Sequence, residues 1–150
     1  MSKTDDLYVV FGTGPVGYAV MNELLSRGRQ VRVVNRHGKL DMPEGVELVQ
    51  GDASDVSFTR EACKGVSVVY NCLNAPYTQW PEVFPPLQAG VIEGAANSNA
   101  KLVVMENVYV YGPTHGKPIT EDLPYAATTR KGRVRAQMVV VPLQFISQFQ

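Results

Sequence analysis

The chain has 150 residues, of which 45% are hydrophobic and 19% are charged. This is enough apolar material for one globular core but not for two comfortable domains, so one compact unit is expected. The 14 basic and 14 acidic side chains cancel to a formal net charge of +0, which removes the electrostatic argument for binding nucleic acid or an anionic membrane.

Other features of the sequence favour a reducing, cytoplasmic setting. The longest uncharged apolar stretch, residues 138–149, contains Pro142 and falls short of the roughly 20 apolar residues that a membrane span needs. The N-terminal MSKTDD lacks the apolar run of a secretory signal. Cys63 and Cys72 have neither the spacing of a metal site nor the density of a disulfide framework, so no metal is expected.

Short apolar runs alternate with helical patterns along the chain. The runs predict buried strands at residues 7–11, 31–34, 46–49, 66–70 and 101–105. Apolar residues at helical spacing predict helices over about 16–27 and 82–98, and capping and turn residues predict a short helix over 55–63. This alternation indicates an α/β fold: a doubly wound parallel sheet with helices on both faces.

Local signals predict where these helices begin. Ser54 is a candidate N-cap for the helix over 55–63. Pro85 and Pro86 are expected in the first turn of the helix over 82–98, where proline is tolerated.

The amphipathic pattern is lost from Met138, where the sequence carries no further charge. We therefore expect a dinucleotide-binding domain over residues 1–137 and an atypical tail over 138–150. Doubly wound dinucleotide domains have about six strands, so a shortened product with its C-terminal part missing is expected. The uncovered sheet edge of such a product favours self-association.

A glycine-rich motif follows the first predicted strand and opens the first predicted helix. It reads Gly12-Thr13-Gly14-Pro15-Val16-Gly17, which is G-x-G-x-x-G in the context that dinucleotide binding requires. The first glycine permits a tight turn, the second lets backbone N–H groups approach a pyrophosphate, and the third allows close helix packing. The helix N-terminus then faces the anion. The alternative is a strand-to-helix turn that binds nothing.

The end of the second predicted strand carries the residues that select the cofactor ribose in this arrangement. Asn35 and Arg36 stand there in place of an acidic residue, and a guanidinium pairs with a 2′-phosphate. NADP is therefore favoured, with NAD possible; alternatively Arg36 is a solvated loop residue. Asp52 follows the third strand, where it meets either the adenine or the backbone of a turn.

With these residues in view, the chain resembles the extended and atypical short-chain dehydrogenase/reductase superfamily, in its NAD(P)-dependent epimerase/dehydratase branch. The resemblance rests on the glycine motif, on Gly51-Asp52, on the segment 70–76 (YNCLNAP) and on the segment 107–113 (NVYVYGP). It implies a Rossmann-like NAD(P)-binding fold and a small-molecule substrate. It further implies that Asp52 contacts the adenine, that Ala53 also belongs to the cofactor site, that Arg36 contacts the 2′-phosphate, and that one wall of the nucleotide groove is formed by Cys72, Leu73 and Asn74. Relatives pair through the helices that correspond to residues 82–98 and 128–140, which implies a homodimer.

The family's catalytic tyrosine, with a lysine four residues later, has no counterpart, because none of the seven tyrosines has such a lysine. The resemblance instead places Asn107 at the family's serine or threonine, Lys131 at its tyrosine and Arg135 at its lysine. Lys131 starts as a cation and must lose a proton before acting as a base. Tyr109 or Tyr125 is an alternative proton donor.

The sequence therefore predicts an NADP(H)-binding, epimerase/dehydratase-like oxidoreductase that acts on a sugar nucleotide or a small carbonyl or alcohol compound. Two alternatives stay open. One is a non-catalytic dinucleotide-binding sensor or scaffold, which the missing tyrosine–lysine pair permits. The other is an inactive truncated fragment.

Overall fold

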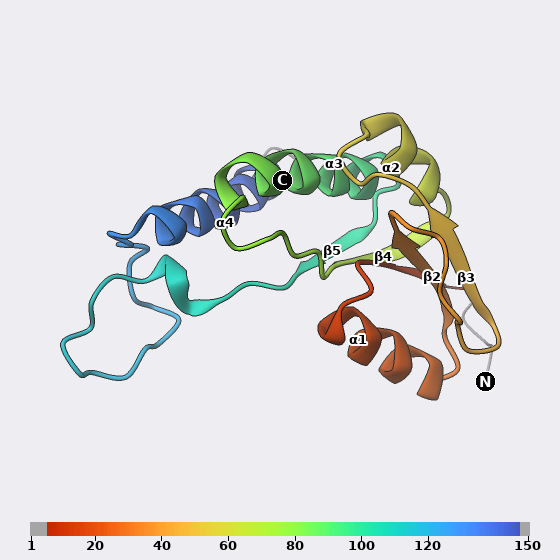
Figure 1. The fold of residues 1–150 in the computed structure, drawn as a ribbon, viewed down its shortest axis with the longest axis horizontal. Helices are drawn as coiled ribbons and strands as arrows, with labels where there is room; N and C mark the ends of the chain where they lie inside the picture. Colours follow the sequence, from red (N-terminus) through yellow and green to blue (C-terminus); the bar gives the residue numbers. More distant parts are fainter. Residues whose placement is uncertain (1–5, 148–150) are drawn as a thin grey trace. The chain divides into compact units, whose positions relative to one another are not determined.

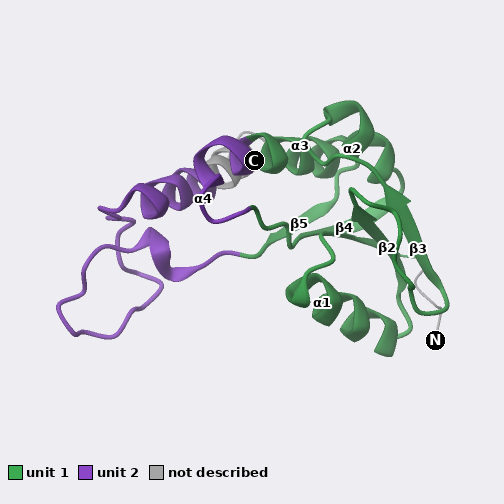
Figure 2. Ribbon diagram, in the orientation of Figure 1, with its two compact units in different colours: residues 1–75, 86–105 green, residues 76–85, 106–150 purple. Residues whose placement is uncertain are grey.

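The computed structural model describes residues 6–147, with side chains described up to residue 140. The chain divides into two compact units (Figure 2). Residues up to 75 and 86–105 form the first unit, and residues 76–85 and 106 onward form the second unit. The boundary predicted between residues 137 and 138 does not coincide with this division.

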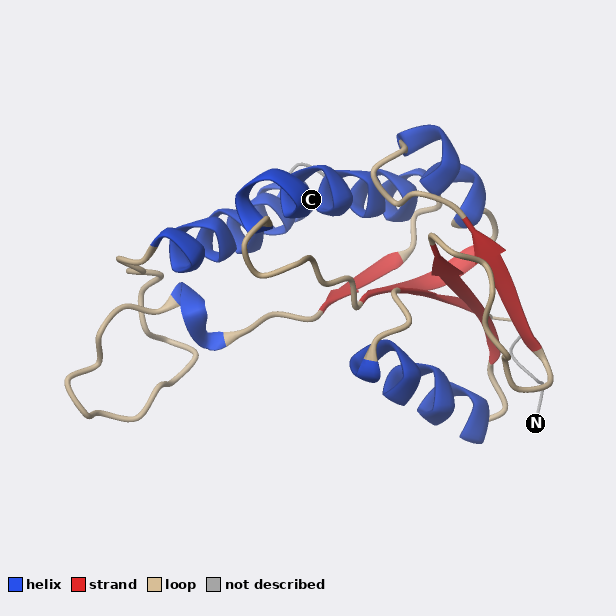
Figure 3. Ribbon diagram, in the orientation of Figure 1, coloured by secondary structure: helices blue, strands red, loops and turns tan. Residues whose placement is uncertain are grey.

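The first unit is built on a parallel sheet, as the alternating pattern predicted (Figures 1 and 3). Its strands, each within one residue of its predicted ends, are β1 (Leu7–Phe11), β2 (Gln30–Asn35), β3 (Val46–Gln50), β4 (Val66–Asn71) and β5 (Lys101–Val104). They lie in the order β3-β2-β1-β4-β5. The order reverses at β1, so the carboxyl ends of β1 and β4 border the crevice in which open α/β sheets bind ligands.

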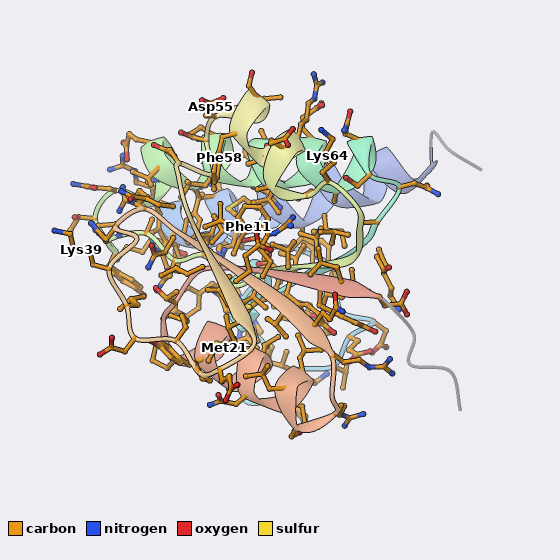
Figure 4. All side chains as sticks on the ribbon, turned by 90° about the vertical axis from the view of Figure 1, so that its right-hand side faces the viewer. Phe11, Met21, Lys39, Asp55, Phe58 and Lys64 are labelled. Carbon is orange, nitrogen blue, oxygen red and sulfur yellow. The ribbon has the colours of Figure 1, made fainter. Side chains whose placement is uncertain are left out.

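Helices cover both faces of this sheet. Helix α1 (Pro15–Ser26) covers one face, where Met21 and Leu24 pack against Val10 and Val31. Helix α2 (Val56–Ala62) and the later part of α3 (Trp80–Asn97) cover the other face, in a core that includes the fully buried Phe11. Figure 4 shows Phe11 and Met21 on opposite sides of the strands. The predicted doubly wound arrangement is confirmed.

The start of α2 corrects one sequence prediction. The N-cap is Asp55, whose carboxylate accepts hydrogen bonds from the backbone N–H groups of Ser57 (2.8 Å) and Phe58 (3.2 Å). Ser54, the predicted cap, instead donates its N–H and hydroxyl to Asp52. Both residues are good caps by type, and the three-dimensional course of the turn decides between them.

Helix α3 begins at Trp80, two residues before its predicted start. Pro85 and Pro86 therefore lie inside the helix, and the expectation that they occupy its first turn was wrong. Neither proline has a backbone N–H to offer to the preceding turn, so the helix lacks two of its usual hydrogen bonds there. The division between the two units falls between these two prolines.

The second unit contains the start of α3, a short 3-10 helix η1 (Val108–Val110), an irregular loop and helix α4 (Arg130–Ser147). Helix α4 runs seven residues past the predicted end at about 140 and through Pro142. Loss of charged residues removes the amphipathic contrast but not the backbone hydrogen bonds, and a single proline removes only one of them. Within residues 6–147, no helix is both long and apolar enough to cross a bilayer.

Candidate functional site

The glycine motif forms a close-packed turn between β1 and α1. Gly12 has a φ of 104°, and a Cβ there would lie 2.8 Å from the carbonyl oxygen of Cys72. A Cβ at Gly17 would collide with the carbonyl oxygen of Gly12. Any larger side chain at either position forces the backbone apart, so glycine is needed here for the helix to start against the strand.

Gly14 differs from these two glycines because nothing crowds it. A Cβ at Gly14 would find no atom within 4 Å, and the residue is exposed. Gly14 is the N-cap of α1, no side chain caps the helix, and Pro15 follows at its start. The first-turn amides of α1 therefore face outward beside an open backbone, as an anion-binding helix N-terminus requires.

Asn35 organises the loop that follows β2. The buried side chain accepts hydrogen bonds from the backbone N–H groups of His37 (3.1 Å) and Gly38 (2.6 Å). Its amide nitrogen lies 3.4 Å from the hydroxyl of Thr13 in the glycine turn. The Asn35 side chain thus connects the loop after β2 to the glycine turn. The sequence predicted Asn35 as a cofactor-binding residue and did not predict this structural role.

Arg36 and Asp52 lie close together at the carboxyl ends of β2 and β3. Arg36 is exposed, and its carbonyl oxygen accepts a hydrogen bond from the side chain of Gln50 (3.1 Å). Hydrogen bonds from Ser54 and, to a lesser extent, the charge of Arg36 lower the pKa of Asp52. Asp52 therefore acts as a turn residue in this structure, and its predicted adenine contact stays a prediction.

The other predicted groove residues occupy neighbouring positions of the first unit. Ala53 is buried in the core, and its carbonyl oxygen lies against Gly90, where any Cβ would collide with it. Cys72 directly follows β4, and its N–H donates to the carbonyl oxygen of Phe11 (2.9 Å), which places it beside the end of β1 at the order reversal. Burial raises the pKa of the Cys72 thiol. Leu73 is half-buried and Asn74 is exposed beside it.

The residues predicted for catalysis all lie in the second unit. Asn107 caps η1, and its side-chain oxygen accepts a hydrogen bond from the N–H of Tyr109 (3.0 Å). The ammonium of Lys131 lies 3.1 Å from the centre of the Tyr77 ring. A cation over the face of an aromatic ring is attracted by the ring quadrupole, so the Lys131 side chain is engaged with Tyr77 in this structure.

Arg135 is 7% exposed and packs against aromatic rings. Its guanidinium lies 4.5 Å from the ring centre of Phe84 and 5.1 Å from that of Trp80. Its Nε lies 3.7 Å from a carboxylate oxygen of Glu106, and neither atom has a hydrogen-bond partner among the described residues. Burial lowers the pKa of Arg135 and raises the pKa of Glu106. The opposite charge of the partner offsets part of each shift.

Sequence reasoning missed the roles of Tyr77 and Glu106. Both are brought to their partners by tertiary contacts between segments far apart in the chain, and neither belongs to a recognisable motif. Tyr77 follows the segment 70–76 and Glu106 immediately precedes Asn107. Their closeness in the chain to the segments 70–76 and 107–113, which carry the family resemblance, is the one sequence signal for Tyr77 and Glu106. Among the described residues, no group of three or more histidine, cysteine or acidic side chains is arranged to hold a metal ion.

A parallel sheet in this strand order, with an open glycine turn at the head of its first helix, defines a dinucleotide-binding α/β domain. Comparison with known families gives the same result. The chain belongs to the NAD(P)H-binding family, which it matches over residues 12–135.

Individual relatives support the resemblance to short-chain dehydrogenases. The chain is 33% identical over 140 residues to sterol-4-alpha-carboxylate 3-dehydrogenase, decarboxylating, from Mus musculus, covering 84% of this chain and 36% of that protein. It superposes on uronate dehydrogenase from Agrobacterium tumefaciens with a TM-score of 0.79 and 16% identity, covering 96% and 57% of the two chains.

A short-chain dehydrogenase/reductase superfamily protein from Agrobacterium tumefaciens, solved with bound NAD, has a TM-score of 0.71 and 23% identity. That match covers 90% of this chain and 43% of the other. The chain thus spans about a third of the curated relative's length and about half the length of these solved structures. The predicted Rossmann-like fold and superfamily resemblance are confirmed.

Proposed function

We propose that this chain is the dinucleotide-binding part of an NADP(H)-dependent, epimerase/dehydratase-like oxidoreductase. The observation that carries the proposal is the glycine turn, which is crowded at Gly12 and Gly17 and open at Gly14. A turn that only linked β1 to α1 has no need of the open, uncapped position. The substrate proposed is a sugar nucleotide or a small carbonyl or alcohol compound, in line with the dehydrogenases to which the chain is similar.

The residues present fit a dinucleotide. The amides at the start of α1 would receive the pyrophosphate, Asp52 and Ala53 would border the adenine, and Cys72 to Asn74 would wall the groove. When bound, the cofactor supplies hydride chemistry. The chain's own residues contribute binding, orientation and proton handling.

Arg36 supports a preference for NADP over NAD. It is exposed at the carboxyl end of β2, its carbonyl oxygen accepts a hydrogen bond from Gln50, and the neighbouring carboxylate of Asp52 is already engaged with Ser54. A guanidinium in this position pairs well with a phosphate on the ribose.

The test of this preference is calorimetric titration of the wild type, Arg36→Met and Lys39→Met with NADPH and NADH. Lys39 is an exposed cation on the same loop and serves as the matched control (Figure 4). Arg36→Met should weaken NADPH binding by about tenfold, roughly 1.4 kcal/mol, and leave NADH within about twofold. Tighter or equal NADH binding by the wild type, or equal losses for both cofactors, would contradict the preference.

A second candidate function is a dinucleotide sensor or scaffold without catalysis. It is favoured by the contacts of Lys131 and Arg135, which hold the residues at the family's tyrosine and lysine positions against aromatic rings. NADPH binding without turnover of any sugar nucleotide or small carbonyl compound would support the sensor. Absence of both would support an inactive fragment.

The proposal includes a cytoplasmic location and a homodimer that uses the helix over residues 82–98. Both cysteines are free thiols in this structure, which suits a reducing compartment. Sedimentation equilibrium at several protein concentrations tests the dimer, and a mass equal to one 16.4 kDa chain at every concentration would exclude it.

A further inference from the structure

The residue proposed to bind the 2′-phosphate lies on an irregular part of the first unit. Arg36 is the first residue after β2, and residues 36–45, which join β2 to β3, form neither helix nor strand. Irregular connections are in general more mobile than strands. An arginine on such a connection meets a phosphate with a fixed geometry only if another part of the structure holds its backbone in place.

Gln50, the last residue of β3, supplies such a support. Its side-chain nitrogen donates a hydrogen bond to the carbonyl oxygen of Arg36 (3.1 Å). Gln50 pairs with Asn35 in the parallel register of β2 and β3, and the N–H of Gly51 donates to the carbonyl oxygen of Asn35 (2.9 Å). The donor to Arg36 therefore comes from a residue whose own backbone is held by the sheet.

The Gln50 side chain lies against the turn that follows Arg36. A Cβ at Gly38 would lie 2.5 Å from the side-chain oxygen of Gln50 and 2.9 Å from the Gln50 Cβ. Gly38 also has a φ of 63°, in the left-handed region that favours glycine. Glycine at this position therefore permits both the turn and its close contact with Gln50.

Asn35 holds the same turn through its backbone N–H groups. Its side-chain oxygen accepts hydrogen bonds from the N–H groups of His37 (3.1 Å) and Gly38 (2.6 Å). The carbonyl group of Arg36 is thus bound by one strand residue, and the two residues after Arg36 are bound by another. Because these bonds form without a ligand, the position of Arg36 is organised before a cofactor binds.

The side chain of Arg36 is available to a ligand. It is exposed, and among the described residues no carboxylate forms an ion pair with it. Its charge still helps to lower the pKa of Asp52, after the larger effect of the hydrogen bonds from Ser54. The positive charge therefore acts at the carboxyl ends of both β2 and β3, where its backbone support also lies.

We propose that Gln50 is a positioning residue that determines the preference of this protein for NADPH over NADH by holding the backbone of Arg36. The inference rests on the proposed function, in which Arg36 binds the 2′-phosphate. Gln50 acts through Arg36, so its loss should weaken binding of the cofactor that carries this phosphate. NADH has a hydroxyl group in its place and gains little from an accurately placed guanidinium.

The first experiment examines the protein without a cofactor. Backbone amide hydrogen exchange is measured by NMR for the wild type, Gln50→Met and Gln30→Met. Methionine keeps the length of the side chain but not its amide, and Gln30 is a matched control, an exposed glutamine at the opposite end of β2. Opening of the turn in Gln50→Met breaks one hydrogen bond fewer, so exchange at His37 and Gly38 should be about two- to tenfold faster. Gln30→Met should leave it unchanged. Wild-type exchange rates in Gln50→Met would overturn the inference.

The second experiment is a double-mutant cycle on cofactor affinity. NADPH and NADH are titrated by calorimetry into the wild type, Gln50→Met, Arg36→Met and the double variant, and thermal unfolding confirms that each is folded. Gln50→Met should weaken NADPH binding by about two- to tenfold, the effect of one hydrogen bond, and leave NADH within about twofold. In the Arg36→Met background the same change should have no further effect, because the group that Gln50 positions is absent.

The outcomes separate the role of Gln50 from the proposed function. A folded wild type that binds neither cofactor, or binds both equally well, refutes the proposed NADP preference and the inference with it. If the wild type prefers NADPH, the role of Gln50 alone is refuted by unchanged NADPH affinity in Gln50→Met. An equal loss for both cofactors, or a loss that persists without Arg36, would show a general structural role and would likewise refute it.

Discussion

An added methyl group should have different effects at two glycines of the same turn: at Gly14 it should weaken NADPH binding, and at Gly17 it should lower stability. Gly14→Ala introduces a Cβ that meets no atom within 4 Å, at a φ of −76° and ψ of −179° that any residue adopts. Its free energy of unfolding should stay within about 0.5 kcal/mol of wild type, as for other unstrained surface changes. The new methyl group stands beside the first-turn amides, so NADPH affinity should fall by about tenfold or more, roughly 1.4 kcal/mol.

Gly17→Ala introduces a Cβ that collides with the carbonyl oxygen of Gly12. A carbonyl is part of the backbone and cannot rotate aside, so α1 must move away from β1. Overpacking of this kind lowers stability by about 1–3 kcal/mol. At about 2–4 °C per kcal/mol for a chain of this size, the melting temperature should fall measurably.

Thermal unfolding followed by circular dichroism, together with calorimetric titration of NADPH, distinguishes the two variants. The expected result is a stable Gly14→Ala protein that binds weakly and a Gly17→Ala protein that is destabilised. Unchanged NADPH affinity in Gly14→Ala would show that the open backbone is not the phosphate site. Wild-type stability in Gly17→Ala would show that the close packing does not matter.

Three further predictions concern a helix cap, a buried acid and the thiols. Asp55→Ala should lower the free energy of unfolding by about 1 kcal/mol through loss of the α2 cap, measured by urea unfolding. Burial raises the pKa of Glu106 above its ordinary value of 4.5, so stability should be greatest below that value and fall as pH rises through the raised pKa. Glu106→Gln should make the free energy of unfolding, measured by urea unfolding at several pH values, depend less on pH. The same pH dependence in this variant and the wild type would contradict the role given to Glu106. Cys63 is fully buried with its pKa raised to about 12, so alkylation of the native protein, read by mass spectrometry, should reach the half-buried Cys72 first.

Local patterns predicted the parts of the first unit that local chemistry determines. The strands are short β-branched runs, and the glycine turn requires specific residues at fixed spacing, so both could be predicted from the sequence. Helix starts were less predictable because several residues compete for the same role. Ser54 and Asp55 are both good caps, and only the folded turn shows that Ser54 is already bonded to Asp52.

The cluster formed by Tyr77, Tyr109 and Lys131 could not be predicted, because tertiary packing brings these residues together. Tyr77, Tyr109 and Lys131 come from the turn before α3, from η1 and from α4, and no spacing along the chain relates them. The close approach depends on Gly132, whose requirement for a missing Cβ is visible only beside the carbonyl of Tyr109. No tyrosine of the chain has a lysine four residues later, so spacing along the sequence does not point to this cluster.

Calorimetric titration of the wild-type chain with NADPH tests the central claim most directly, since the glycine turn, the strand order and the family all lead to dinucleotide binding. We expect saturable binding at one site per chain, with NADH binding more weakly. Absence of detectable binding to either cofactor by a folded sample would contradict it.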